Sequence, residues 1–223
     1  KDVPMEIEPR FALATFGERE RPEDAFVSNR YPNLAALPAG AVVGTSSLRR
    51  ECQLRARYPQ LKFRALRGNV NTRLAKLDAG DYDAIILACA GLDRLGEARR
   101  IRSRLEPPKW LPAAAQGAIA IEYRAGDERV ANLIMPLDDP DTAVCVTAER
   151  ALTRHLQGSC QVPIAAYCID IESGLHLSGL VGDAASGRLL RAEASGAAET
   201  PDALGREVAE LLLAQGAGEL LGR

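Results

Sequence analysis

Residues 41–88 decide the fold and read AVVGTSSLRRECQLRARYPQLKFRALRGNVNTRLAKLDAGDYDAIILA. Three short apolar runs in this stretch predict β-strands: 41–44, 61–66 and 83–88. The segments between them carry apolar residues at helical spacing, as in Leu48, Cys52 and Ala56. The continuous apolar run DAIILA is typical of a strand buried on both faces of a parallel sheet. Strands alternating with helices therefore predict a doubly wound α/β domain.

The C-terminal part of the chain follows another pattern. Prolines near residues 107–112 interrupt the alternation, and a strand at 118–123 and a helix at 128–135 follow. Asp139 or Asp141 is expected to cap a long helix that ends near His155. Three strand-like runs come next, before two short helices: 162–169, 175–181 and 189–194. Successive strands joined by Gly, Asp and Ser turns predict a small α+β domain with an antiparallel sheet.

The overall composition excludes several classes of protein. The 223 residues are 47% hydrophobic and 26% charged, which is typical of a globular protein rather than a disordered or disulfide-stapled one. A net charge of −2 argues against a nucleic-acid-coating protein and a polybasic membrane anchor. The longest apolar stretch, 84–92, is too short to cross a bilayer. Five cysteines without a C-x-x-C pair favour a reducing, cytoplasmic compartment, and no zinc-site spacing is present, so we expect no metal.

Arginine is unevenly used. The chain has 24 arginines and four lysines, and twelve of the arginines fall between Arg49 and Arg104. A GC-rich coding sequence would explain this bias together with the 37 alanines. However, arginines follow all three predicted parallel strands, where open α/β sheets bind their ligands: Arg49, Arg50, Arg67, Arg73 and Arg94. A single such arginine is usually a solvated surface residue, but together they predict a pocket for several carboxylates or phosphates. Because phosphate-binding glycine loops are missing, carboxylates are favoured.

The cysteines divide into two groups. Cys52, Cys89, Cys145 and Cys168 occupy apolar positions and are expected in the core. Cys160 lies in the polar loop GSCQ, where its thiol could be a nucleophile, an attachment point or a loop cysteine without function. A catalytic pair with His155 is conceivable, although a histidine at a helix C-terminus is ordinarily explained by stabilisation of the helix dipole.

Four motifs resemble those of the porphobilinogen deaminase (hydroxymethylbilane synthase) family, from Lys1 almost to the C-terminus: GTSSLRR (44–50), LRGNVNTRLAKLDAGDYDAIILACAGLDRLG (66–96), AAQGAIAIE (114–122) and GSCQVPIAAY (158–167). The resemblance implies a transferase of tetrapyrrole biosynthesis. Such an enzyme joins four porphobilinogen molecules head to tail, releases ammonia, and frees hydroxymethylbilane by hydrolysis. It also implies hinged α/β domains of the periplasmic-binding-protein type and a dipyrromethane cofactor, held by a thioether to Cys160.

The resemblance assigns the other site residues by motif position. Asp2 matches the catalytic aspartate, whose carboxylate would stabilise the cation left by loss of ammonia. The remaining matches are expected to bind the carboxylates of cofactor and substrate: Lys1, Thr45, Ser47, Arg49, Arg50, Arg67, Gly68, Asn69, Arg73, Arg94 and Gln116.

Three domains are expected from the same match: residues 1–20 with 118–137 (the remainder of domain 1), 21–112 (domain 2) and 138–223 (domain 3, carrying Cys160). The run KDVP at residues 1–4 looks like the end of a longer family motif, so we expect an incomplete cleft and little turnover from this chain alone. Porphobilinogen is the expected partner of a monomer that binds neither nucleic acid nor membrane.

Two other functions compete with this one. A non-catalytic anion-binding module would leave Cys160 without a role, and a Cys160–His155 thiol hydrolase would leave the arginines unexplained.

Overall fold

The computed structural model describes residues 2–158 and 162–222. Its helices and strands follow one another as β1 (Phe11–Phe16), β2 (Asp24–Val27), β3 (Val42–Gly44), α1 (Leu48–Arg57), β4 (Lys62–Arg64), α2 (Val70–Asp78), β5 (Ala84–Ala88), α3 (Cys89–Arg94), β6 (Ile101–Leu105), β7 (Ala120–Arg124), α4 (Glu128–Ile134), α5 (Pro140–His155), β8 (Ile164–Ile171), β9 (Gly174–Gly182), β10 (Leu189–Gly196), α6 (Pro201–Ala214) and α7 (Ala217–Leu220). Short 3-10 turns lie between some of them.

A five-stranded sheet with the order β4-β3-β5-β2-β6 forms the centre of the α/β part. The predicted parallel arrangement of β3, β4 and β5 is confirmed. Strands β2 and β6 were not predicted, and both join the sheet antiparallel to their neighbours. The helix α3 begins directly at Cys89, where β5 ends.

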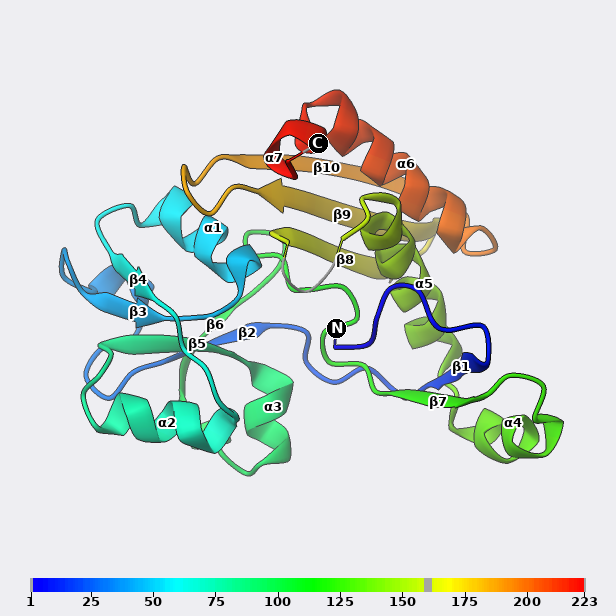
Figure 1. Cartoon of the computed structure of the whole chain (residues 1–223), viewed down its shortest axis with the longest axis horizontal. Coiled ribbons are helices and arrows are strands. Elements are labelled where there is room, and N and C mark those ends of the chain that lie inside the picture. Colours follow the sequence, from blue (N-terminus) through cyan, green and yellow to red (C-terminus); the bar gives the residue numbers. More distant parts are fainter. Residues whose placement is uncertain (1, 159–161, 223) are drawn as a thin grey trace.

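Helices cover both faces of this sheet, so the predicted doubly wound arrangement is confirmed (Figure 1). Side chains of successive strand residues point to opposite faces. Ile85 and Leu87 of β5 therefore pack with α2 and α3, whereas Ile86 packs on the other side with Leu54 of α1. A strand that buries both faces needs apolar residues at every position, which explains the uninterrupted AIILA sequence of β5.

The C-terminal part is the predicted antiparallel sheet, with the order β10-β9-β8. Helices α5 and α6 cover one face of it, where Leu152, Leu177 and Val208 share a buried apolar cluster. The other face rests on α1 through a second cluster that includes Cys52 and Leu180. Because α1 also packs on the five-stranded sheet through Leu54, this helix lies between the five-stranded and the three-stranded sheets.

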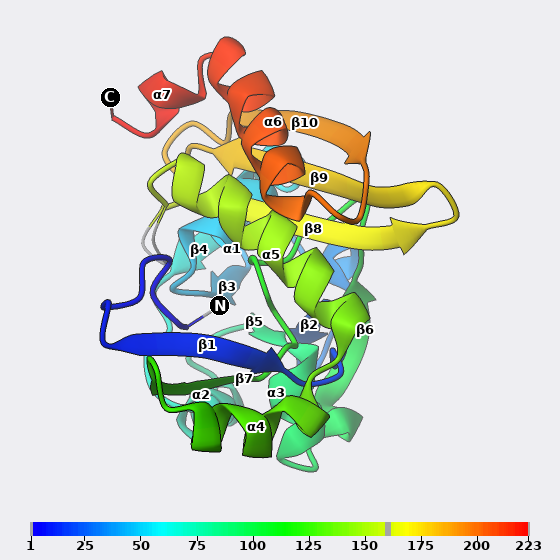
Figure 2. The same cartoon turned by 90° about the vertical axis from the view of Figure 1, so that its right-hand side faces the viewer.

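The segment before β2 pairs with a distant part of the chain. Strand β1 runs antiparallel to β7, from Phe11 opposite Arg124 to Phe16 opposite Ala120. Figure 2 shows this ribbon beside α4, below α5. Arg19, just after β1, donates to both carboxylate oxygens of Glu149 on α5, over 2.7 and 3.1 Å. This buried ion pair anchors the N-terminal segment to the helix that also covers the C-terminal sheet.

Candidate functional site

Two adjoining cavities open where β3 and β5 end, against the N-terminal segment and the loop before β7. The first has a volume of about 300 Å³ and the second of about 250 Å³. Four of the predicted site residues line both cavities: Asp2, Arg50, Arg73 and Gln116. Ser47 and Arg49 line only the first cavity, and Arg94 only the second. The structure thus brings together seven residues that are up to 114 positions apart in sequence (116 − 2).

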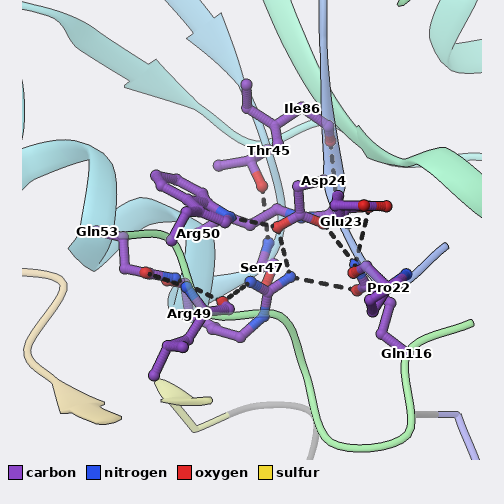
Figure 3. Close-up of polar contacts among 12 residues, drawn as sticks. Pro22, Glu23, Asp24, Thr45, Ser47, Arg49, Arg50, Gln53, Ile86 and Gln116 are labelled. Atoms are coloured by element: carbon purple, nitrogen blue, oxygen red, sulfur yellow. Dashed lines mark hydrogen bonds and ion pairs between the residues drawn. The ribbon is translucent and has the colours of Figure 1, made fainter. Parts of the chain in front are cut away.

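Arg49 and Arg50 meet at a carboxylate that the sequence analysis missed (Figure 3). Arg49 Nη2 lies 2.9 Å from Asp24 Oδ2, and Arg50 Nη2 lies 2.7 Å from Asp24 Oδ1. The two guanidinium groups also donate to backbone carbonyls, Arg49 to Leu111 and Arg50 to Ile86. Both arginines are buried, with 4% and 7% of their surface exposed, so they are held rigidly rather than solvated.

The opposite charges in this cluster stabilise each other electrostatically. Burial alone would raise the pKa of Asp24, but the two arginines and the hydrogen bonds from Arg50 and Trp110 hold it well below its ordinary value. Burial lowers the pKa of Arg49, and Asp24 offsets part of that effect. Arg50 Nε is buried and has no hydrogen-bond partner in the described part of the chain. A buried donor without an acceptor is costly, and this one belongs to a residue that lines both cavities.

Gln116 joins this cluster from the loop before β7. Its side-chain amide donates to Asp24 Oδ1 over 2.9 Å and to the Pro22 carbonyl over 2.6 Å. The loop turns sharply here, because Ala115 and Gly117 have φ angles of 58° and 95°. A Cβ atom at residue 117 would lie 2.2 Å from the Glu20 carbonyl oxygen, so the close approach of the two chain segments requires glycine.

Asp2 and Arg73 line both cavities and interact electrostatically. The Arg73 Nε donates to the Gly68 carbonyl over 2.8 Å, which fixes the guanidinium at the start of α2. Burial and the nearby Arg50 lower the pKa of Arg73, whereas the Asp2 carboxylate raises it. Asp2 is exposed. The site therefore places a carboxylate next to guanidinium groups that are themselves close together, an arrangement suited to an anionic ligand carrying a transient positive charge.

The other predicted residues take different places. Thr45 is buried and accepts a hydrogen bond from the Ser47 amide, and Asn69 caps α2 by accepting from the Thr72 amide. Ser47 is the N-cap residue of α1 but makes no side-chain capping bond. Arg67 is exposed and borders neither cavity among the described residues. Arg94 donates to the Gly117 carbonyl, the partner that keeps it at the second cavity.

Lys1 and Cys160 lie outside the described residues. Residues 162 and 164, just beyond Cys160, line the first cavity. The four other cysteines are buried, as predicted, and burial raises the pKa of both Cys52 and Cys89 to about 12. His155 pairs with Glu210 on α6, so the structure gives no support to a Cys160–His155 hydrolase.

Several residues of the site escaped the sequence analysis: Asp24, Ser46 and Trp110. Ser46 exchanges hydrogen bonds with the backbone of Leu66 and lines the first cavity. Trp110 donates its indole N–H to Asp24 Oδ2 over 2.7 Å. The available signal was the sequence DAFV, in which one charged residue begins an otherwise apolar run.

No cluster of three or more His, Cys, Asp or Glu side chains suitable for a metal ion occurs among residues 2–158 and 162–222. Within the same ranges, no helix has the length and apolar character that a membrane crossing requires.

Solved structures similar to this chain include periplasmic-type binding proteins. A putative methionine-binding lipoprotein from Bacillus subtilis matches 57% of this chain and 61% of its own, with 12% identity and a TM-score of 0.41. An arginine-specific periplasmic binding protein from Salmonella typhimurium matches 60% of this chain and 59% of its own, with 16% identity and a TM-score of 0.38.

Relatives found by sequence are much more similar to this chain than these solved structures are. Residues 1–132 match the family profile "Porphobilinogen deaminase, dipyromethane cofactor binding domain", and residues 143–214 match "Porphobilinogen deaminase, C-terminal domain". Porphobilinogen deaminase from Stenotrophomonas maltophilia strain K279a is 60% identical over 99% of this chain and 73% of its own length. The enzyme from Xanthomonas euvesicatoria is 58% identical over the same shares. The chain therefore belongs to the porphobilinogen deaminase family, the transferases that polymerise porphobilinogen to hydroxymethylbilane on a dipyrromethane cofactor.

Proposed function

We propose that the two cavities bind the acetate and propionate groups of the pyrrole rings, and that Asp2 is the catalytic carboxylate. The observation that carries this proposal is the convergence of Arg49, Arg50 and Arg73 on one space beside Asp2. Each pyrrole ring of porphobilinogen carries two carboxylates, so a growing chain of rings needs several cationic donors in a fixed arrangement.

The described residues fit the dipyrromethane. Arg50 Nε is a buried donor that lacks an acceptor within the described ranges, and a ligand carboxylate would supply one. Arg49, Arg73 and Gln116 would hold the carboxylates of the group, with Ser46 and Ser47 as neutral donors at the same cavity. When bound, through a thioether that we assign to Cys160, the dipyrromethane supplies the free pyrrole carbon to which the next ring is joined.

Asp2 would act on the incoming substrate. Loss of ammonia from the aminomethyl group leaves a positive charge on the pyrrole, and a carboxylate fixed nearby lowers the energy of that cation. The same carboxylate can accept and return a proton at the pyrrole nitrogen. Arg73, whose pKa is raised by the nearby Asp2 carboxylate, would orient that carboxylate.

Substitution of Asp2 by Asn tests this role in the full-length enzyme. We expect kcat to fall about 100-fold or more, because the charge is lost while the shape is kept. The protein should still fold and bind substrate. Asp81→Asn is the matched control, since Asp81 is also exposed but borders neither cavity, and it should leave kcat unchanged. An Asp2→Asn enzyme with the kcat of the wild type would refute the assignment.

We further propose that the chain is a cytoplasmic monomer that binds neither nucleic acid nor membrane. We also propose that the chain divides into three domains, formed by residues 1–20 with 118–137, 21–112 and 138–223. The pairing of β1 with β7 supports the first unit, because it joins these two distant segments into one ribbon. Light scattering coupled to size-exclusion chromatography tests the monomer, and limited proteolysis near residues 112 and 138 tests the boundaries.

A further inference from the structure

We infer that Asp24 is a positioning residue for carboxylate recognition: it holds Arg49, Arg50 and Gln116 in the orientation that the ligand meets. This inference rests on the proposed function of those three residues. Asp24 itself borders neither cavity and has no exposed surface, so it acts through its partners.

The Asp24 carboxylate is a hub, a single side chain surrounded by four donor groups. Oδ1 accepts from Arg50 Nη2 over 2.7 Å and from Gln116 Nε2 over 2.9 Å. Oδ2 accepts from Trp110 Nε1 over 2.7 Å and lies 2.9 Å from Arg49 Nη2. Four donors from α1 and from the segment 110–116 therefore converge on one side chain of β2, as Figure 3 shows for the arginines and Gln116.

The charge balance explains why a carboxylate is needed at this position. Two guanidinium groups held close together repel each other, and burial makes that repulsion stronger because the surroundings screen it poorly. Asp24 neutralises one of the two charges and leaves one positive charge shared by the pair. The pair can then remain buried and rigid without a ligand, while Arg50 Nε stays available as a donor.

Rigidity matters because a ligand with many carboxylates is recognised by the direction of the donors as well as by charge. Flexible arginines would lose side-chain entropy on binding, whereas arginines already fixed by Asp24 have lost it on folding. Removing Asp24 should therefore weaken recognition of the shaped ligand. It should also raise the net positive charge of the site, and thereby its attraction for a simple anion.

The substitution Asp24→Asn tests whether recognition of the pyrrole ligand weakens while binding of a simple anion strengthens. In either orientation the new amide nitrogen faces two donors, so the hub is broken without a large change in volume. We expect kcat/KM for porphobilinogen to fall about tenfold or more, while inorganic phosphate, measured by calorimetry, binds more tightly. Asp83→Asn is the control. Asp83 lies just before β5, at the opposite end of the sheet from the cavities, where it accepts a hydrogen bond from the Val42 amide, and it borders neither cavity. It should change neither quantity.

The outcomes separate the possibilities. A folded Asp24→Asn protein in which both quantities stay within about twofold of wild type, or in which both weaken together, would overturn the inference. If that variant does not fold, Trp110→Phe removes one donor from Oδ2 and keeps both ion pairs; a raised KM with unchanged kcat supports positioning, and an unchanged KM contradicts it. Arg73→Gln tests the proposed function separately, because the side chain of Arg73 bonds to the Gly68 carbonyl and not to Asp24. If Arg73→Gln leaves KM unchanged, the proposed function fails. If Arg73→Gln raises KM but Asp24→Asn changes neither kcat/KM nor phosphate affinity, only the inference fails.

Discussion

Replacement of Glu149 by Gln should be one of the most destabilising conservative changes in this protein. Glu149 is fully buried on α5 and accepts four hydrogen bonds. Oε1 accepts from Arg19 Nη1 over 2.7 Å and from the Cys168 amide over 2.8 Å. Oε2 accepts from Arg19 Nη2 over 3.1 Å and from the Ala115 amide over 2.6 Å. Each oxygen thus serves one backbone N–H and one guanidinium N–H.

The magnitude follows from that arrangement. Whichever oxygen becomes NH₂, it faces two donors, so one buried backbone amide loses its acceptor at a cost of about 1–3 kcal/mol. Arg19 is also buried, and Glu149 more than offsets the lowering of its pKa by burial. Without the carboxylate its charge is left uncompensated, and breaking a buried pair costs about 3–5 kcal/mol in total.

Equilibrium unfolding in urea measures this loss, with the single tryptophan, Trp110, and circular dichroism as two probes. Glu8→Gln is the control, because Glu8 forms a 2.8 Å ion pair with Arg10 on the surface, with 65% of its side chain exposed. That variant should lose less than about 1 kcal/mol. A Glu149→Gln protein whose free energy of unfolding falls by no more than that of the control would refute the reasoning.

Two further predictions concern packing and pH. Gly179→Ala should lower the free energy of unfolding by about 1–3 kcal/mol, because a Cβ atom there would lie 2.7 Å from Leu152 Cδ1 and 2.9 Å from Val208 Cγ1. Thermal melts check this against Gly17→Ala, where the new methyl group meets no atom within 4 Å; equal melting temperatures would contradict it. Because the pKa of Asp24 is depressed in the folded protein, its contribution to stability is complete above its ordinary value of 3.8 and is lost as the pH falls from there toward its folded pKa. Melting temperatures measured between about pH 5 and pH 2 should therefore fall more steeply in the wild type than in Asp24→Asn, and parallel curves would argue against an ionised Asp24.

Local patterns were sufficient for much of the fold. The apolar runs and helical stripes of residues 41–88 predicted β3, β4 and β5 with their helices, because these periods reflect burial on one or two faces of a single element. The same reasoning predicted the antiparallel sheet β8–β10. It left the cap of α5 open between Asp139 and Asp141, and the structure has Asp139. Strands β2 and β6 escaped it. β2 has only four residues, and both strands owe their place to pairing with distant segments.

The sequence by itself also determined the family, since the motifs that carry it are contiguous. The same motifs predicted five arginines for the site, and four of them line the two cavities. The tertiary structure decided which residues share a cavity and what each side chain does there. It placed Asp24 among Arg49, Arg50, Trp110 and Gln116. The physical reason is that a buried charge is stable only among particular partners, and those partners come from segments 25 to 92 residues away (Arg49 and Gln116 counted from Asp24). Local periodicity in the sequence does not predict such contacts between distant segments.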